Sequence, residues 1–209
     1  MLKLIMFDLD GTCHNTISKI KHCFEYSINK IGGNTTWEYA RNFLGMPHYI
    51  FAEKVAPDKS EEYIKYYIDE YMSMEEAPLY EGTVDTINRL KEKYKVVLVT
   101  GKPRDLTLKC FEVLGISNLF DYLVCGDDTE KTKPNPEPLY KAMDYYNCKA
   151  NEALYIGDGL FDVEATKRAN VPIIAVTWGG TAKKRLLEEN PAYIADTWND
   201  VEKIIEKLQ

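Results

Sequence analysis

The amino-acid sequence predicts a doubly wound α/β protein with a mostly parallel sheet and an all-helical subdomain inserted after the first strand. Short apolar runs without strict alternation, which are typical of strands buried on both faces of a sheet, alternate along the chain with helical stretches. The segment from about residue 14 to 80 breaks this alternation and carries helical patterns only. Strand–helix alternation implies βαβ units, and therefore a Rossmann-like core.

The strands are expected where apolar runs are short and bounded by turn residues. The first lies within Leu2–Leu9, whose sequence is LKLIMFDL. Three strong runs and two weaker ones follow it. The strong runs are Val96–Val99, Ala153–Ile156 and Ile173–Val176, and the weaker ones are Tyr122–Val124 and Tyr193–Ala195.

Helices are expected between these strands, from the spacing of apolar residues and from stop signals such as Gly115. The clearest are Val84–Lys93, Leu106–Leu114, Glu137–Tyr146 and Phe161–Ala169. Two more are expected near the end of the chain, at Ala182–Glu189 and Asp200–Leu208.

The insert is predicted at residues 14–81, between a core made of residues 1–13 and 82–209. Its helices are expected at Ser18–Ile31, Trp37–Leu44, Pro47–Val55 and Glu61–Met74. Pro78 and Gly82 mark the second joint. An insert at this position overhangs the carboxyl ends of the strands, where open α/β sheets bind ligands.

Composition restricts the function classes. The chain has 209 residues, a formal net charge of -7 and 28% charged residues. An acidic protein of this kind is not expected to bind nucleic acid, which needs a basic face. Its five scattered cysteines have no CxxC spacing and predict reduced thiols rather than disulfides or a zinc site. No apolar run approaches the ~20 residues of a membrane span, and the protein is expected to be cytoplasmic.

Polar groups follow each strong strand. The first ends in Asp8-Leu9-Asp10-Gly11-Thr12, the second in Thr100-Gly101-Lys102, and the third in Gly157-Asp158-Gly159, with Asp162 one helical turn later. A loop between the second and third holds Lys133 in the sequence KTKPNP. If the strands are parallel, these groups meet at one edge of the sheet. A DxD, KPxP or GDG segment alone is usually a turn, but their joint occurrence at strand ends predicts a functional site.

The predicted cluster of carboxylates must either take up protons or be balanced by a cation. Two like charges ~4 Å apart repel by about 4 kcal/mol at an effective dielectric near 20. Oxygen ligands without nearby histidine or cysteine favour a hard ion, and Mg²⁺ shares its coordination shell with phosphate oxygens. The site is therefore expected to bind Mg²⁺ together with an anionic substrate.

The spacing of Asp8 and Asp10 suggests how two carboxyl groups divide the chemistry. In a strand, residues i and i+2 point to the same side. Asp8 can attack phosphorus to give an acyl phosphate, and Asp10 can protonate the leaving oxygen and later activate water. Thr100, the amides that follow it and Lys133 offer donors to the phosphate oxygens.

The order of these motifs resembles the haloacid dehalogenase superfamily of phosphohydrolases. The matching segments are DLDGT at 8–12, Thr100 after an apolar strand, Lys133 in KPNPEP, and GDGLFD at 157–162. The resemblance covers nearly the whole chain, since the insert lies where one large branch of the family carries a helical cap. Within this branch, Leu44-Gly-Met-Pro and the residues after DLDGT are most similar to phosphoglycolate phosphatases and relatives that act on small organic phosphates or pyrophosphate.

The resemblance implies a role for each matched residue. Asp8 would be the nucleophile and Asp10 the acid/base. Mg²⁺ would be held by Asp8, the main-chain carbonyl of Asp10 and Asp158, while Asp162 would bind the metal's waters or orient its ligands. The phosphate-binding residues would be Thr100, Gly101 and Lys133.

The residues of the cap carry weaker expectations. Arg41 is a candidate for the anionic end of the substrate, although a solvated helix face is the simpler interpretation. His14 and His48 are expected to be surface or packing residues rather than acid/base groups. The tyrosines of the fourth cap helix are expected to form a packing surface, and the protein is expected to be a monomer or a homodimer through this helix. These tyrosines are Tyr63, Tyr66, Tyr67 and Tyr71.

Three other functions are considered for a chain with these motifs. Dehalogenases of the superfamily need neither a metal nor a second carboxyl group, so Asp10 and Asp158 argue against that activity. A sugar-phosphate mutase stays open as an alternative. A non-catalytic binding or regulatory member would be expected to lack one of the motif residues, and none is missing. A small phosphorylated metabolite is the expected partner.

Overall fold

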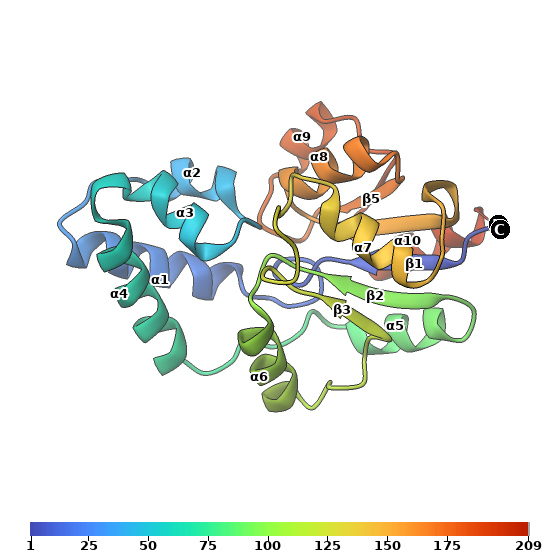
Figure 1. The fold of residues 1–209 in the computed structure, drawn as a ribbon, viewed down its shortest axis with the longest axis horizontal. Coiled ribbons are helices and arrows are strands. Elements are labelled where there is room, and N and C mark those ends of the chain that lie inside the picture. Colours follow the sequence, from blue (N-terminus) through green and yellow to red (C-terminus); the bar gives the residue numbers. More distant parts are fainter. Residues whose placement is uncertain (209) are drawn as a thin grey trace.

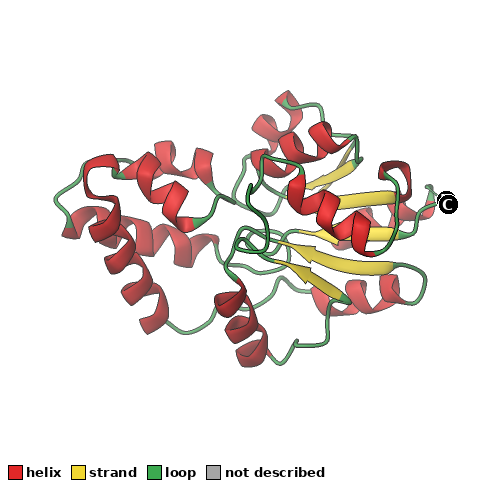
Figure 2. Cartoon of the chain, viewed as in Figure 1, coloured by secondary structure: helices red, strands yellow, loops and turns green. Residues whose placement is uncertain are grey.

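The computed structural model describes residues 1–208, which form a parallel six-stranded sheet with helices on both faces and a helical insert beside it (Figures 1 and 2). The strand order is β3-β2-β1-β4-β5-β6. The strands are β1 (Leu4–Phe7), β2 (Lys95–Val99), β3 (Tyr122–Val124), β4 (Ala153–Gly157), β5 (Ile173–Val176) and β6 (Tyr193–Ala195). The predicted doubly wound parallel fold is confirmed.

The first strand lies at the centre of the sheet. Phe7, its last residue, pairs with Leu98 of β2 and with Ile156 of β4. The chain then builds the sheet outward from β1 in both directions, so the β1–β4 boundary is the topological switch point. Ligands of open α/β sheets bind at this point, beyond the carboxyl ends of the strands.

Two apolar clusters hold the helices against the sheet. One cluster joins alternate residues of β1 and β2, such as Phe7 and Leu98, to α5 (Thr83–Lys91), α6 (Arg104–Leu114) and α10 (Trp198–Glu206). The other joins the opposite set, such as Met6, to α7 (Glu137–Tyr145), α8 (Leu160–Ala169) and α9 (Lys183–Glu188). This explains why β1 is apolar at every position, since both of its faces are buried.

The insert folds around a third apolar cluster of its own. Figure 1 shows its helices, coloured blue to cyan-green, set beside the carboxyl ends of the strands. They are α1 (Ile17–Lys30), α2 (Trp37–Ala40), α3 (His48–Val55) and α4 (Ser60–Ser73), with 3₁₀ helices at Arg41–Phe43 and Pro57–Lys59. Phe24 of α1 lies against Phe51 of α3 and Tyr63 of α4, with ring centroids 6.3 and 6.5 Å away. We call this insert the cap.

Two chain segments cross side by side between core and cap. His14 forms an isolated antiparallel bridge with Leu79. The Asn15 amide donates to the Pro78 carbonyl at 3.0 Å, and the Tyr80 amide donates to the Cys13 carbonyl at 2.9 Å. Two paired backbone segments therefore connect the core to the cap, and we call this connection the hinge. Within residues 1–208, the structure has no helix that is both long and apolar enough to span a bilayer.

The predicted elements are all present, with most boundaries displaced by no more than two residues. The exception is the helix predicted at Trp37–Leu44. There the α-helix ends at Ala40, and the chain continues as a 3₁₀ helix to Phe43. The side-chain amide of Asn42 donates to the Glu38 and Tyr39 carbonyls, which gives these two backbone groups hydrogen-bond partners at the end of the short helix. A 3₁₀ helix at Ala150–Glu152 completes the set.

Candidate active site

The turn after β1 brings two distant aspartates together. Gly11 has a φ of +88°, and a Cβ at this position would lie 2.4 Å from a carboxylate oxygen of Asp158. Only glycine permits both this backbone and this approach. The hydroxyl of Thr12 donates to Asp158 Oδ1 at 3.0 Å and fixes that carboxylate. The DLDGT segment therefore builds the contact between the ends of β1 and β4.

Three carboxylates converge at this edge of the sheet. Asp8, Asp158 and Asp162 each offer an oxygen, and these three atoms lie within 4.8 Å of one another. All three residues are buried, each only 3% exposed. Burial and the charge of Asp162 raise the pKa of Asp158 to about 7, against hydrogen bonds from Gly180 and Thr12. Burial and its two acidic neighbours also raise the pKa of Asp8, although Lys133 opposes them. This mutual repulsion is the electrostatic signature of a cation site.

Lys133 lies inside the cluster. Its ammonium contacts Asp8 Oδ1 at 2.8 Å and Asp162 Oδ1 at 2.7 Å, and it also bonds to the hydroxyl of Tyr155 at 2.9 Å. Burial disfavours its charge, but the two carboxylates raise its pKa above the ordinary value. With all three carboxyl groups ionised, one buried lysine among three buried aspartates leaves a net charge of about −2, which a divalent cation would balance.

Asp10 faces a different set of partners. Its Oδ1 accepts hydrogen bonds from Lys102 at 3.0 Å and from Thr16 at 2.9 Å, and lies 3.7 Å from His14 Nδ1. Burial alone would raise the pKa of this carboxyl, but the charge of Lys102, together with His14, holds it well below its usual range. Asp8 and Asp10 line the same pocket. Their pKa values shift in opposite directions, because their surroundings differ in charge.

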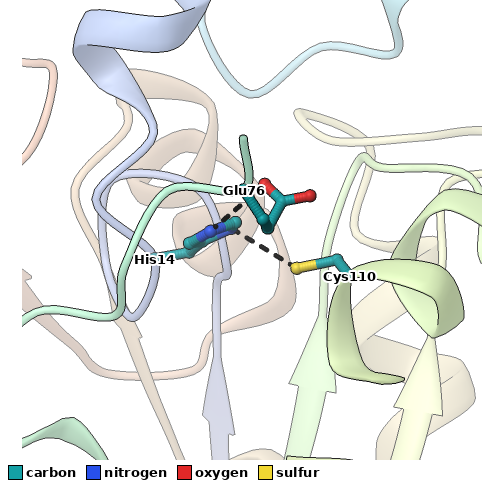
Figure 3. Close-up of side chains that lie close together, drawn as sticks. All are labelled: His14, Glu76 and Cys110. Atoms are coloured by element: carbon teal, nitrogen blue, oxygen red, sulfur yellow. Dashed lines mark hydrogen bonds and ion pairs between the residues drawn. The ribbon is translucent and has the colours of Figure 1, made fainter. Parts of the chain in front are cut away.

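His14 is fully buried, and Figure 3 shows it between Glu76 and Cys110, with a dashed line to each. Its Nε2 lies 2.7 Å from the Ala77 carbonyl and 3.5 Å from Glu76, whereas its Nδ1 lies 3.7 Å from Cys110 Sγ. Glu76 lies nearest to Nε2 and Cys110 to Nδ1, and one ligand atom from each of the three side chains lies within 4.8 Å of the other two. Burial opposes its charge, but Asp10 and Cys110 raise the pKa of His14 to about 9. The burial of His14 confirms that it is a packing residue between cap and core, and its expected lack of an acid/base role stays a prediction.

Thr100 and Gly101 lie where β2 meets the cap. Thr100 lines the pocket, and its hydroxyl accepts a hydrogen bond from the Lys102 amide at 3.2 Å. A Cβ at Gly101 would lie 2.5 Å from the carbonyl oxygen of Gly45 in the cap. Glycine at 101 thus lets the cap loop rest directly on the backbone of the core.

Arg41 lies at another cap–core contact, outside the lining of the pocket. Its guanidinium donates to the Gly180 carbonyl at 2.6 Å and lies 3.7 Å from Glu38. Gly180 also donates its amide to Asp158. The structure therefore connects Arg41 to the acidic cluster through one backbone residue, and not through a surface of the pocket.

The pocket lies between the cap and the sheet edge. Its floor contains Asp8, Asp10 and Thr100, and its upper wall comes from the cap. The helix α4 contributes half of the residues in this wall, including the tyrosines at 63, 67 and 71. These rings form a ladder with centroid separations of 5.9 and 6.1 Å. The tyrosine-rich face of α4 is therefore a pocket wall as well as a packing surface, and homodimerisation through this helix stays a prediction.

Sequence reasoning missed two residues of the site. Lys102 was expected only as part of a turn, yet it contacts Asp10 and also donates to the Tyr71 hydroxyl at 3.2 Å. Tyr155, within a buried strand, donates its hydroxyl to Asp162 at 3.0 Å. A phenol in a strand whose other side chains are all apolar was the available signal, because a buried hydroxyl needs a polar partner.

The fold and the site together define a cap-bearing α/β enzyme with buried carboxylates at the switch point of a parallel sheet. Residues 5–176 match the family described as haloacid dehalogenase-like hydrolase. The chain belongs to this family. It is an enzyme of the phosphatase type, and the resemblance found in the sequence is confirmed.

Named relatives share the fold over nearly their full length. A pyrophosphatase, PpaX from Halalkalibacterium halodurans, is 31% identical over 98% of this chain and 97% of its own. A haloacid dehalogenase-like hydrolase structure from Streptococcus pneumoniae is 25% identical, with a TM-score of 0.84 and 98% of each chain covered. A structure named as a predicted phosphoglycolate phosphatase from Haemophilus somnus has a TM-score of 0.87 at 21% identity, again over 98% of each chain, and supports the fold alone.

Proposed function

We propose that this chain is a Mg²⁺-dependent phosphohydrolase that removes phosphate from a small phosphorylated metabolite through a phospho-aspartate on Asp8. The candidate substrates are phosphoglycolate-like organic phosphates and pyrophosphate. The proposal is carried by one observation: oxygens of Asp8, Asp158 and Asp162 lie within 4.8 Å of one another in a buried position. The relatives named as pyrophosphatases support the same class of reaction.

The donor set fits Mg²⁺. Carboxylate oxygens are the ligands that this ion prefers, and no sulfur or imidazole competes within the cluster. Asp8, Asp158 and the main-chain carbonyl of Asp10 would hold the ion, and Asp162 would orient its waters. When bound, Mg²⁺ supplies positive charge that neutralises the carboxylates and the phosphate oxygens.

The reaction follows from the positions of Asp8 and Asp10. A carboxylate oxygen of Asp8 attacks phosphorus, and the bond from phosphorus to the leaving oxygen breaks. Asp10, whose carboxylate form is favoured by Lys102 and His14, first takes up a proton from solvent and then gives it to that oxygen. In the second step Asp10 takes a proton from water, whose oxygen attacks the phosphorus of the acyl phosphate. Inorganic phosphate leaves, and Asp8 is again a carboxylate.

Phosphate binding is assigned to three groups, of which Thr100 and Gly101 line the pocket and Lys133 lies buried beside Asp8. Thr100 and the amide of Gly101 donate hydrogen bonds to the non-bridging oxygens. Lys133, which is buried between Asp8 and Asp162, adds a full positive charge beside the nucleophile. Donors fixed in position before the substrate arrives need no reorganisation during phosphoryl transfer.

The test is chemical trapping of the intermediate. The protein with Mg²⁺ and a ³²P-labelled substrate should yield a phosphoprotein that hydroxylamine cleaves, as expected of an acyl phosphate. Asp8→Asn should lose both label and turnover while its circular dichroism stays unchanged. Turnover in this variant at the rate of the parent protein would remove Asp8 from the mechanism.

A second assay separates hydrolysis from group migration. Glucose 1-phosphate should give free phosphate and no glucose 6-phosphate, because water attacks the acyl phosphate. Formation of the isomer without free phosphate would identify a sugar-phosphate mutase instead.

A further inference from the structure

The wall of the pocket that faces the phosphate site is apolar and aromatic. Apart from the floor groups, Lys102 and His48, the side chains that line the pocket are aliphatic, aromatic or thioether groups from both domains. The apolar lining from the cap includes Ile20, Leu44, Met46, Phe51, Ile64 and Ile68. Pro103 and Leu106 of the core close the other side. A leaving group held here would lose most of its contact with water.

Among the described residues of this wall, no cation is free to pair with a second anionic group of a substrate. Lys102 is the lysine of the lining, and Asp10 already pairs with it at 3.0 Å. His48 also lines the pocket, but burial lowers its pKa, which favours the neutral ring. Arg41 lies outside the lining and is held by Gly180. The cap therefore offers surface for carbon and no charge for an anion.

A doubly anionic substrate is poorly matched to such a wall. The second phosphate of pyrophosphate, or the carboxylate of phosphoglycolate, would enter an apolar pocket without a charged partner. Moving an unpaired anion from water into an apolar pocket is costly, whereas burying apolar surface is favourable by ~25 cal/mol per Å². An aromatic ring in the leaving group would be stabilised further by offset or edge contacts with the tyrosine ladder of α4.

We infer that the enzyme acts on phosphate monoesters whose leaving group is uncharged and apolar, an aryl or arylalkyl alcohol, and that the cap wall selects them. This inference rests on the proposed function, and within its class of small phosphorylated metabolites it favours apolar monoesters over the candidates phosphoglycolate and pyrophosphate. Ile68 is the side chain through which the wall is best tested. It is half-buried, lies on α4 one residue after Tyr67, and faces the pocket.

The experiment compares three substrates with Mg²⁺ present: 2-phenylethyl phosphate, phosphoglycolate and pyrophosphate. The first two are esters of primary alcohols, so their difference reports mainly on the wall. We expect kcat/KM for 2-phenylethyl phosphate to exceed the other two by at least tenfold. Ile68→Lys, which places a cation in the wall, should reverse this order. Leu108→Lys, on an exposed position of α6 outside the pocket, should leave it unchanged.

Two outcomes separate this inference from the proposed function. Higher kcat/KM for phosphoglycolate or pyrophosphate would overturn the inference while supporting phosphohydrolase activity. If no substrate releases phosphate, the proposed function fails, and binding decides the inference separately. Calorimetry with Asp8→Asn should then show tighter binding of 2-phenylethyl phosphate than of phosphoglycolate; equal or weaker binding would overturn the inference.

Discussion

The ammonium group of Lys102 lies 3.0 Å from Asp10 Oδ1 in a largely buried ion pair. Lys102 follows β2 and Asp10 follows β1, so the pair joins two neighbouring strand ends. The same ammonium donates a hydrogen bond to the hydroxyl of Tyr71 in α4. Lys102 therefore connects the turn after β1, the loop after β2 and the cap. The residue proposed to move protons is thus connected to the position of the cap by one lysine.

Replacing Lys102 with methionine should shift the pH dependence of turnover. Lysine favours the carboxylate form of Asp10, so its removal raises the pKa of Asp10. Activation of water requires that carboxylate, and the acidic limb of the kcat profile should therefore move to higher pH. We also expect a loss of about 1–3 kcal/mol in unfolding free energy, because a buried carboxylate loses a partner. The measurements are kcat from pH 4 to 9 and denaturant unfolding.

Lys93→Met provides the control, since Lys93 is exposed in the turn that follows α5. Its pH profile should overlay that of the parent protein. An acidic limb that stays in place in Lys102→Met would show that this lysine does not govern Asp10.

Binding of Mg²⁺ should weaken as the pH falls below 7. The pKa of Asp158 is raised to about 7 by burial and by Asp162, so below this pH its carboxyl is protonated in the metal-free protein. The ion needs the carboxylate and must displace that proton, at a cost of up to about tenfold in affinity for each pH unit. Isothermal titration at pH 8, 7 and 6 measures the trend. The same Kd at all three values, or the same pH slope in Asp158→Asn, would contradict it.

The residues of the acidic cluster could be predicted from the sequence because parallel strands end at one edge. Asp8 and Asp158 follow strands that pair directly, and their convergence needs only the strand order. Lys102 could not be assigned in the same way. Its partner Tyr71 comes from a helix of the cap, and only the docking of that helix brings the two together. The same holds for Arg41. Helix periodicity predicts the helix face on which Arg41 lies, but it does not predict the hydrogen bond from Arg41 to the Gly180 carbonyl.

Substituting Gly101 with alanine should impair closure of the cap. The added Cβ would lie 2.5 Å from the Gly45 carbonyl oxygen, a contact that requires one backbone to move. The cap can relieve this overlap by remaining open, so the core should keep its stability while kcat/KM falls by about tenfold, or about 1.4 kcal/mol. Steady-state kinetics and small-angle scattering with substrate analogue measure the two effects. Parent-like kinetics, with unchanged scattering, would show that the cap loop does not rest on Gly101 during turnover.

His14→Gln should flatten the dependence of stability on pH between about 6.5 and 9. Asp10 raises the pKa of His14 from 6.5 to about 9 in the folded protein, despite its burial. A raised pKa means that the folded state binds the proton more tightly, so this stabilisation is complete below pH 6.5 and is lost as the pH rises through 9. The full effect is on the order of 3 kcal/mol, and glutamine retains a donor for the Ala77 carbonyl without titrating. Urea unfolding in saturating Mg²⁺ at pH 6, 7.5 and 9 should show the parent protein losing stability relative to the variant. Parallel curves for the two proteins would mean that His14 is neutral in the hinge throughout this range.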